Sequence, residues 1–343
     1  MRTIVIGCLG SMGRRRIRNL KALGYTDIIG YDLVDYKKAK PDCWYTDMLD
    51  EVENFLENPT GEDKKVDGII VSVPPLQKQE YIDLGNKYNV PVFCEADICL
   101  YSGNYYSSAT LRHHVAIQKI KELLEYGTLG KVYTFSYHMG QHLRDWHPGA
   151  DYSNYYAAQK ESGACREMFC FELSWLSYLF GTPINCAGFV DKKLLDPDIK
   201  ADDVFATSVK FKQNTFVEDS FGTYFNTPCL KGHIKEESIT GTVLINILSR
   251  PALRNLRIVG EKCSLLWDWD EDNIQLEYPD GEISLIFYPK GQAFDGYNKN
   301  ISEQMYIDEL ANWLEAVQGK VQYLYSCEDE KACIETLRKV EGK

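Results

Sequence analysis

Residues 4–20 read IVIGCLGSMGRRRIRNL, which predicts a buried strand, a glycine turn and the start of a helix. The apolar run Ile4–Ile6 fits a parallel strand. Gly7, Gly10 and Gly13 follow it as G-x-x-G-x-x-G, one residue longer than the dinucleotide-binding fingerprint. In that fingerprint the glycines permit a tight turn, close approach to a pyrophosphate and helix–strand packing. The helix start also points free N–H groups at an anion. The stretch therefore predicts a dinucleotide site.

An acid follows the second predicted strand. Residues 27–31 read DIIGY and are followed by Asp32, 25 positions after Gly7. A carboxylate there accepts hydrogen bonds from the ribose hydroxyls and repels a 2′-phosphate, which favours NAD over NADP. The alternative is that Asp32 is only a turn residue at the strand end.

Four arginines crowd the start of the first helix, where the helix dipole disfavours cations. They are Arg14, Arg15, Arg16 and Arg18. A solvated basic face is expected for at least two of them. A bound polyanion would also compensate their charge, so NADP remains a minority alternative.

Strand and helix patterns alternate through the first hundred residues. The run VDGIIVSVPP at 66–75 is a buried strand ending in a proline pair, residues 79–88 are helical, and 91–95 form another strand. This order predicts a doubly wound parallel sheet, whose ligand crevice lies at the carboxyl ends of the strands. The expected cofactor contacts are the glycine loop and those strand ends: Gly7, Leu9, Gly10, Ser11, Met12, Gly13, Asp32, Ser72, Val73, Pro74 and Glu95.

The pattern changes after about residue 108. Helices are predicted over 113–126 and 163–180, each followed by a glycine. Residues 184–290 alternate with period two, which indicates a largely antiparallel open sheet. Ser302 and Ser326 are expected to cap the last two helices.

The predicted fold class is therefore α/β with two domains. A Rossmann-type doubly wound parallel sheet is expected over residues 1–125. An α/β domain with an open, mainly antiparallel sheet is expected over 126–343, with C-terminal helices that could pack back on the first domain.

Composition and charge narrow the classes of partner that the protein is expected to bind. The 343 residues carry a net charge of −12, which argues against a nucleic-acid partner. The sequence has no run of 18 apolar residues, so no membrane span is expected. The chain enters a strand at once, which leaves no room for a signal peptide, and none of the 11 cysteines forms C-x-x-C. We expect a cytoplasmic protein with reduced thiols and no metal site.

These pieces, in this order, resemble the Gfo/Idh/MocA superfamily (glucose-fructose oxidoreductase, inositol dehydrogenase and rhizopine catabolism proteins) over nearly the whole chain. The matching segments are the glycine loop at 7–13, VSVPP at 71–75, VFCE at 92–95, YGTLGKV at 126–132 and the helix between Gly163 and Gly181. RNL at 18–20 and the segment from DWHP at 145–148 to Tyr156 resemble a branch near bacterial surface-sugar and nonulosonate oxidoreductases.

The resemblance implies a Rossmann domain followed by an α/β domain, bound NAD(P), and oxidation or reduction of a sugar, cyclitol or sugar derivative. It also implies a homodimer or homotetramer assembled through the open sheet.

The sequence departs from this family at two positions. Most members read Glu-Lys-Pro where this chain has Glu95-Ala96-Asp97, so the lysine is replaced by Ala96. Most also carry an acid and a histidine four residues apart on the later helix, where this chain has Glu167 and Phe171. Lys78 stands where many relatives have a histidine after the proline pair, and a solvated helix start is expected for it. Both usual proton-handling groups are therefore missing.

Substitutes are expected in the long polar loop 138–162 and the helix that follows it. His147 is the preferred acid or base because imidazole titrates near neutral pH, with Glu167 as the second candidate. The alternative is that His147 only shapes the loop.

The substrate contacts expected from the same segments share a polar or aromatic side chain: Arg144, Trp146, Tyr152 and Arg166. The arginines could hold a carboxylate or phosphate, and the aromatic residues could roof or stack on a sugar. Ordinary ion pairs and core packing are the alternatives.

We therefore expect an NAD-dependent oxidoreductase of CH–OH donors acting on a sugar or sugar derivative, such as a nucleotide sugar or a nonulosonate precursor. The main alternative is a non-catalytic sensor or partner protein that binds NAD and sugar. A less favoured alternative is a glycosidase that uses bound NAD for transient oxidation.

Overall fold

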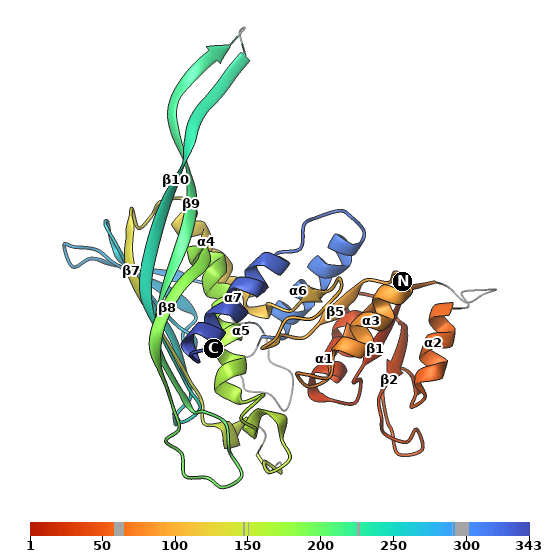
Figure 1. The fold of residues 1–343 in the computed structure, drawn as a ribbon. Helices are drawn as coiled ribbons and strands as arrows, with labels where there is room; N and C mark the ends of the chain where they lie inside the picture. Colours follow the sequence, from red (N-terminus) through yellow and green to blue (C-terminus); the bar gives the residue numbers. More distant parts are fainter. Residues whose placement is uncertain (58–64, 147, 150, 225–226, 290, 292–301) are drawn as a thin grey trace.

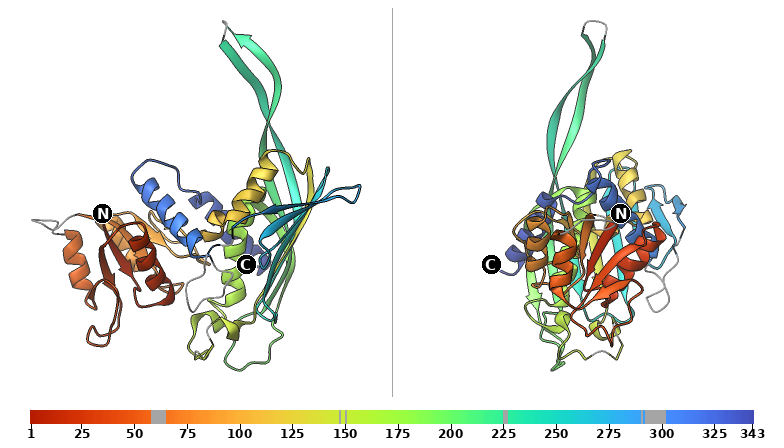
Figure 2. Two further views of the ribbon diagram at one scale, coloured as in Figure 1. Left: turned by 180° about the vertical axis from the view of Figure 1, so that it is seen from behind. Right: turned by 90° about the vertical axis from the view of Figure 1, so that its right-hand side faces the viewer.

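The computed structural model describes residues 1–343 except 58–64, 147, 150, 225–226, 290 and 292–301. Two sheets organise the chain, and helices lie between the larger sheet and the N-terminal domain (Figures 1 and 2). The α/β class predicted from the sequence, a parallel sheet followed by a mainly antiparallel one, is confirmed.

The first sheet is six-stranded and parallel, in the order β3-β2-β1-β4-β5-β6. Its strands are β1 (Arg2–Ile6), β2 (Asp27–Tyr31), β3 (Trp44–Thr46), β4 (Val66–Val71), β5 (Val92–Cys94) and β6 (Tyr106–Ser107). The helices that alternate with them are α1 (Ser11–Ala22), α2 (Leu49–Glu57) and α3 (Gln79–Lys87). The order reverses direction between β1 and β4, so the glycine loop lies at the switch point where such sheets bind ligands.

The second sheet has eight strands in the order β14-β13-β12-β11-β7-β10-β9-β8. They are β7 (Val132–Gly140), β8 (Thr182–Asp191), β9 (Val204–Tyr224), β10 (Thr227–Asn246), β11 (Leu253–Gly260), β12 (Ser264–Asp268), β13 (Asn273–Glu277) and β14 (Ile283–Phe287). Only the β7–β10 pair is parallel among them. The β9–β10 hairpin runs well beyond the rest of the sheet (Figure 1).

Helices cover one face of the second sheet. They are α4 (Val115–Glu125), α5 (Ala164–Phe180) and α7 (Cys327–Val340), and they share one large apolar core with the inward side chains of the strands. α6 (Glu303–Val317) instead packs on the first domain, where the Trp313 ring lies against Gly68 of β4. A Cβ at Gly68 would come within 2.6 Å of that ring, so glycine makes this contact possible.

The helix ends follow the sequence signals with one exception. Ser326 caps α7, because its side chain accepts a hydrogen bond from the Asp329 N–H at 3.1 Å. Ser302 occupies the cap position of α6, but its side chain makes no capping hydrogen bond, so the cap expected from its hydroxyl is wrong. β7 continues to Gly140, so it takes up the first residues of the polar loop expected over 138–162.

Candidate functional site

The glycine loop has the geometry that its sequence predicts. Gly7 adopts φ +72°, in the left-handed region, and its carbonyl accepts the Gly10 N–H at 3.1 Å. A Cβ at Gly13 would lie 2.1 Å from the Gly7 carbonyl oxygen, so only glycine lets α1 start this close to the turn. A Cβ at Gly10 would meet nothing closer than that same oxygen, at 3.3 Å. The loop therefore presents bare backbone at the N-terminus of α1.

Asp32 lies beside this loop at the end of β2. One of its carboxylate oxygens accepts the Leu9 N–H at 3.0 Å, and the other accepts the Leu33 N–H at 2.8 Å. The carboxylate is half-buried, so it both holds the glycine loop in place and faces solvent next to it.

Carboxylates of this chain compensate most of the arginine cluster on α1. Arg16 is fully buried and makes two hydrogen bonds to Glu95, at 2.8 and 2.7 Å, and an ion pair to Glu309 of α6 at 2.9 Å. Arg15 and Arg18 both pair with Glu303. Arg15 and Arg16 are buried, so a solvated face is left to Arg14, which is exposed, and Arg18, which is partly exposed.

Glu95 is the centre of this network at the end of β5. Its carboxylate also accepts the Ser72 hydroxyl at 3.0 Å, which ties β5 to β4. Burial would raise the pKa of Glu95, but the Arg16 charge and hydrogen bonds outweigh it and hold the pKa below its usual value. Glu95 is therefore a fixed anion between the two strand ends expected to face the cofactor.

The solvated helix start expected for Lys78 is wrong. Lys78 is fully buried, and its ammonium donates to the carbonyls of Glu95 at 2.7 Å and Ala96 at 3.2 Å. It also forms an ion pair with the buried Asp97 carboxylate at 2.7 Å. Burial would lower the pKa of Lys78, but the Asp97 charge outweighs it and raises the pKa. The charged Lys78 ammonium thus holds the backbone of residues 95–97 in place.

Glu167 lies on the first turn of α5, and only one of its two carboxylate oxygens makes a hydrogen bond. One of its carboxylate oxygens is 3.2 Å from the Tyr156 hydroxyl, which donates to it. The other oxygen is out of contact with solvent and has no hydrogen-bond partner. Burial raises the pKa of Glu167 to about 7, although the Lys78 charge and the Tyr156 hydrogen bond oppose the shift. Near neutral pH this carboxyl can therefore either take up or release a proton.

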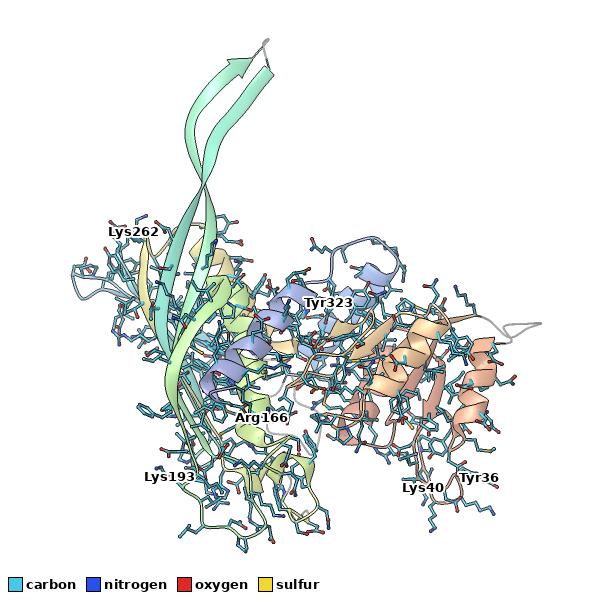
Figure 3. The ribbon with its side chains drawn as sticks, viewed as in Figure 1. Tyr36, Lys40, Arg166, Lys193, Lys262 and Tyr323 are labelled. Carbon is cyan, nitrogen blue, oxygen red and sulfur yellow. The ribbon has the colours of Figure 1, made fainter. Side chains whose placement is uncertain are left out.

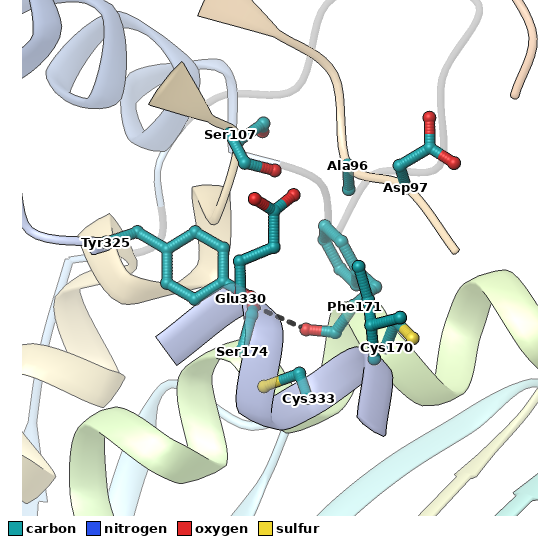
Figure 4. A pocket seen from close by; sticks show the side chains of 11 residues that line it. Ala96, Asp97, Ser107, Cys170, Phe171, Ser174, Tyr325, Glu330 and Cys333 are labelled. Carbon is teal, nitrogen blue, oxygen red and sulfur yellow. Dashed lines mark hydrogen bonds between the residues drawn. The ribbon is translucent and has the colours of Figure 1, made fainter. Parts of the chain in front are cut away.

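A small cavity of about 10 Å³ lies next to these residues (Figure 4). Ala96 and Phe171, the two positions that depart from the family pattern, both line it, as does Glu330 of α7. Cys333 and Ile334 of α7 line the cavity as well.

The predicted substrate arginines make ion pairs in this structure. Arg144 binds Asp196 through two hydrogen bonds, at 2.6 and 2.8 Å, and also pairs with Asp198. Arg166 of α5, labelled in Figure 3, pairs with Glu341 near the end of the chain. Both arginines therefore make ordinary ion pairs, which is the alternative given for them above. Binding of substrate by either arginine stays a prediction.

The other candidates from loop 138–162 are Tyr152, Trp146 and His147. The Tyr152 ring is buried and its hydroxyl donates to the Leu143 carbonyl at 2.6 Å. Trp146 is half-buried, and its indole N–H is out of contact with solvent without a hydrogen-bond partner. His147 lies outside the described residues, so its part in catalysis stays a prediction.

Three charged members of this site, the Lys78–Asp97 pair and Glu330, were not predicted from the sequence. Asp97 closely follows the family segment VFCE at 92–95 and could have been paired with a nearby cation. No sequence signal places Glu330 there, because it comes from a helix 233 positions after Asp97. Among the described residues, no group of three or more His, Cys, Asp or Glu side chains could hold a metal ion, and no helix is long and apolar enough to cross a membrane.

A family model confirms the resemblance read from the sequence. Residues 117–265 match the GFO/IDH/MocA C-terminal domain. No curated protein matches the chain.

Solved structures share the whole fold. An oxidoreductase from Agrobacterium radiobacter, determined with NAD+, L-tartaric acid and magnesium, is similar at 13% identity and TM-score 0.74, covering 100% of this chain and 95% of its own. Levoglucosan dehydrogenase with NADH is similar at 14% identity and TM-score 0.70, covering 99% and 97%. A probable dehydrogenase from Thermotoga maritima reaches 18% identity and TM-score 0.69, covering 100% and 96%. At these identities the likeness establishes the fold.

Replacing Arg16 tests the buried network. Arg16→Met leaves Glu309 and Glu95 without their cation in a buried place, so we expect the free energy of unfolding to fall by about 3–5 kcal/mol. Arg14→Met is the matched control, because Arg14 is exposed on the same helix and should change stability by less than about 1 kcal/mol. Urea denaturation followed by fluorescence measures both. Equal stability of the two variants would show that the buried pairs do not hold the domain together.

Proposed function

We propose that this protein, which carries the GFO/IDH/MocA C-terminal domain behind a Rossmann domain and belongs with that superfamily, is an NAD-dependent oxidoreductase acting on a sugar or sugar derivative. One observation carries the proposal. Glu167, a half-buried acid with an unused oxygen and a pKa of about 7, lies next to the strand ends where a Rossmann domain presents its cofactor.

The glycine loop fits the diphosphate of a dinucleotide. Its bare backbone at Gly10 and the positive dipole end of α1 suit a phosphate pair. Asp32 suits the ribose hydroxyls, and its negative charge disfavours the 2′-phosphate of NADP. Two of the similar solved structures were determined with NAD+ or NADH. When bound, the nicotinamide supplies the hydride acceptor or donor.

The residues expected near the nicotinamide are at the ends of β4 and β5. Ser72 and Glu95 are joined by a hydrogen bond there, and Val73 and Pro74 continue the β4 end. We therefore expect the reacting carbon of a substrate to lie between residues 95–97 and the first turns of α5.

Glu167 would move the proton that accompanies hydride transfer. In the oxidising direction its carboxylate removes the hydroxyl proton of the substrate carbinol as the C–H hydride leaves, and in the reducing direction the same carboxyl returns it. Tyr156 orients one oxygen and leaves the other for this task. A positioned acid or base of this kind typically supplies 10²- to 10⁴-fold in rate, which could replace the missing lysine and histidine. His147, the acid or base preferred from the sequence, stays the alternative for this task.

A polyhydroxylated substrate fits the same place. The similar structures were determined with L-tartaric acid, L-sorbose and levoglucosan, which all carry several hydroxyl groups. The loop 138–162, with Trp146 on it, would roof such a ligand. A nucleotide sugar or nonulosonate precursor is the finer form of the proposal. Thiols at all ten cysteines that the structure describes suit a cytoplasmic setting.

The substitutions at 96 and 171 favour one second candidate, a sensor that binds NAD and a sugar without turnover. Stabilisation by NAD with no NADH formed from any sugar of a broad panel would support the sensor over the enzyme.

We also propose that the open face of the second sheet binds a second copy of the chain. On β14, Ile286 packs against the core, so its exposed neighbours Leu285 and Phe287 point to the opposite face. On β8, Val190 packs inward and Phe189 is 78% exposed. Both edge strands thus present apolar side chains on the face that no helix covers, which is typical of an association surface.

Cofactor choice can be tested at Asp32. Asp32→Asn keeps an acceptor for the Leu9 N–H but removes the charge, so we expect NAD to bind about tenfold more weakly and NADP to lose less or gain. Asp42→Asn, at an exposed position of the following loop, should leave both affinities unchanged. Calorimetric titration measures each. An equal loss for NAD and NADP would contradict the specificity argument.

The acid–base assignment can be tested at Glu167. Glu167→Gln should lower kcat/KM for sugar oxidation by about 10²- to 10⁴-fold. In the native enzyme the oxidation rate should rise as pH increases through about 7, because the carboxylate is the proton acceptor, and the variant should lack that rise. Glu161→Gln, an exposed carboxylate just before the same helix, is the control. An unchanged pH profile in Glu167→Gln would rule out this assignment.

The association surface can be tested on β14. The paired changes Leu285→Lys and Phe287→Lys place two charges on that face and should convert a dimer or tetramer to monomers. Light scattering after size exclusion measures the mass. Tyr126→Lys changes an exposed aromatic residue at the end of α4 and should leave the mass unchanged. A monomeric native protein, or an oligomer that survives the paired change, would refute the surface.

A further inference from the structure

The cavity beside Ala96 is the size of one small polar group. Its volume of about 10 Å³ is close to the minimum that one water molecule needs. Figure 4 shows Glu330 and Tyr325 on one side of it, with Ala96 and Phe171 near the carboxylate of Glu330. The cavity therefore adjoins the place proposed for the reacting carbon.

The polar groups around this cavity present acceptors. Glu330 is only 4% exposed, and one of its carboxylate oxygens has no hydrogen-bond partner. The Ser174 hydroxyl donates its proton to the Phe171 carbonyl at 2.7 Å, so it offers lone pairs to any other group. Asp97 adds a second carboxylate to the lining.

No cation balances these acceptors within the lining. The lining residues are Ala96, Asp97, Ser107, Ser108, Cys170, Phe171, Ser174, Tyr325, Glu330, Cys333 and Ile334, and none of them is Lys, Arg or His. The nearby Lys78 ammonium has three protons, and it uses them on the Glu95 and Ala96 carbonyls and the Asp97 carboxylate. The unpartnered Glu330 oxygen therefore lacks a donor.

We propose that this cavity receives the ammonium group of an amine-bearing substrate, with Glu330 as its counter-ion. An ammonium group is about the size of a water molecule and carries only donors, which matches the acceptors that Glu330, Ser174 and Asp97 present to the cavity. The inference rests on the proposed function, and it narrows the substrate from a sugar derivative to one with a primary amine. In this arrangement the substrate supplies the cation at the position that most relatives fill with a lysine.

Charges from every element around Glu330 bear on its protonation. Burial and the Asp97 carboxylate after β5 both raise its pKa, and the net value, with the opposing groups included, is about 7. Hydrogen bonds from Ser107 and Tyr105, at β6, and the Lys78 charge lower it. From α5, Cys170 and Ser174 line the cavity and add no charge while the thiol is protonated. On α7 itself Cys333 is also a buried thiol.

A pH dependence follows from this balance. Below about pH 7 the Glu330 carboxyl is neutral and is a poor partner for a cation, and above it the carboxylate attracts one. Binding of an ammonium group should therefore strengthen with pH, by up to about tenfold per pH unit below the pKa, and release a proton.

Methylammonium is the probe that tests the cavity without knowledge of the substrate. We expect it to raise the Tm of the full chain at about pH 8 more than at about pH 6, while tetramethylammonium, which has no N–H donor, gives no such rise at equal ionic strength. Glu330→Gln should lose the methylammonium effect. Glu328→Gln, an exposed carboxylate on the same helix, should keep it.

A second variant keeps the test decisive if Glu330→Gln does not fold. Ala96→Lys supplies an ammonium from the chain itself, so it should also abolish the methylammonium effect. Equal Tm changes with the two ammonium salts in the native protein would overturn the inference. An effect that persists in Ala96→Lys and in folded Glu330→Gln would overturn it too.

The substrate arm compares amino sugars with their hydroxyl counterparts, for example D-glucosamine with D-glucose, by NADH formation. We expect turnover or binding to favour amino members, and Glu330→Gln to remove that preference. A preference for the hydroxyl members in the native protein would contradict the inference. NAD titration separates the two proposals. NAD binding without a methylammonium effect would contradict only the ammonium site. A methylammonium effect without NAD binding would contradict the proposed function.

Discussion

The Arg16 guanidinium is the contact on which the arrangement of the site depends. It joins α1, which starts at the glycine loop, to Glu95 at the end of β5 and to Glu309 of α6. Glu309 accepts three further hydrogen bonds, from the Ser108 and Thr110 hydroxyls and the Ala109 N–H. Buried charges are stable only when paired and hydrogen-bonded in this way. The pairs fix the distance between the cofactor loop and the strand ends where chemistry would occur.

Charge balance explains why the site can lack its usual lysine and histidine. Lys78 brings a cation from the start of α3 to the backbone of 95–97, and Asp97 neutralises it. Glu167 and Glu330 then remain as two carboxyls without an ion pair of their own, and burial, only partly opposed by the Lys78 charge, raises the pKa of each to about 7. Such groups exchange protons near neutral pH and attract donors, which are the properties that hydride-transfer chemistry on a carbinol and recognition of an amine require.

Local signals predicted the fold well. The strand, glycine turn and helix at 4–20 are encoded by residues within one short segment, and the period-two alternation of 205–211 directly reflects one buried face. The Lys78–Asp97 pair and Glu330 escaped prediction because their burial arises only when α3, β5 and α7 meet. The burial of Arg15 and Arg16 was not predicted for the same reason, since their partner carboxylates Glu303 and Glu309 lie almost 300 positions away on α6 and Glu95 lies at the end of β5. Side-chain pairing over such separations leaves no trace in one sequence.

Hydrogen–deuterium exchange with and without NAD+ tests the central claim most directly, namely that a nicotinamide dinucleotide lies along the glycine loop and reaches the acids at the end of β5. The account predicts slower amide exchange in peptides covering 7–13 and 95–97 when NAD+ is added. Peptides from β12 to β14, at the far edge of the second sheet, should not change. Unchanged exchange at both first sites, or protection confined to the far edge, would contradict it.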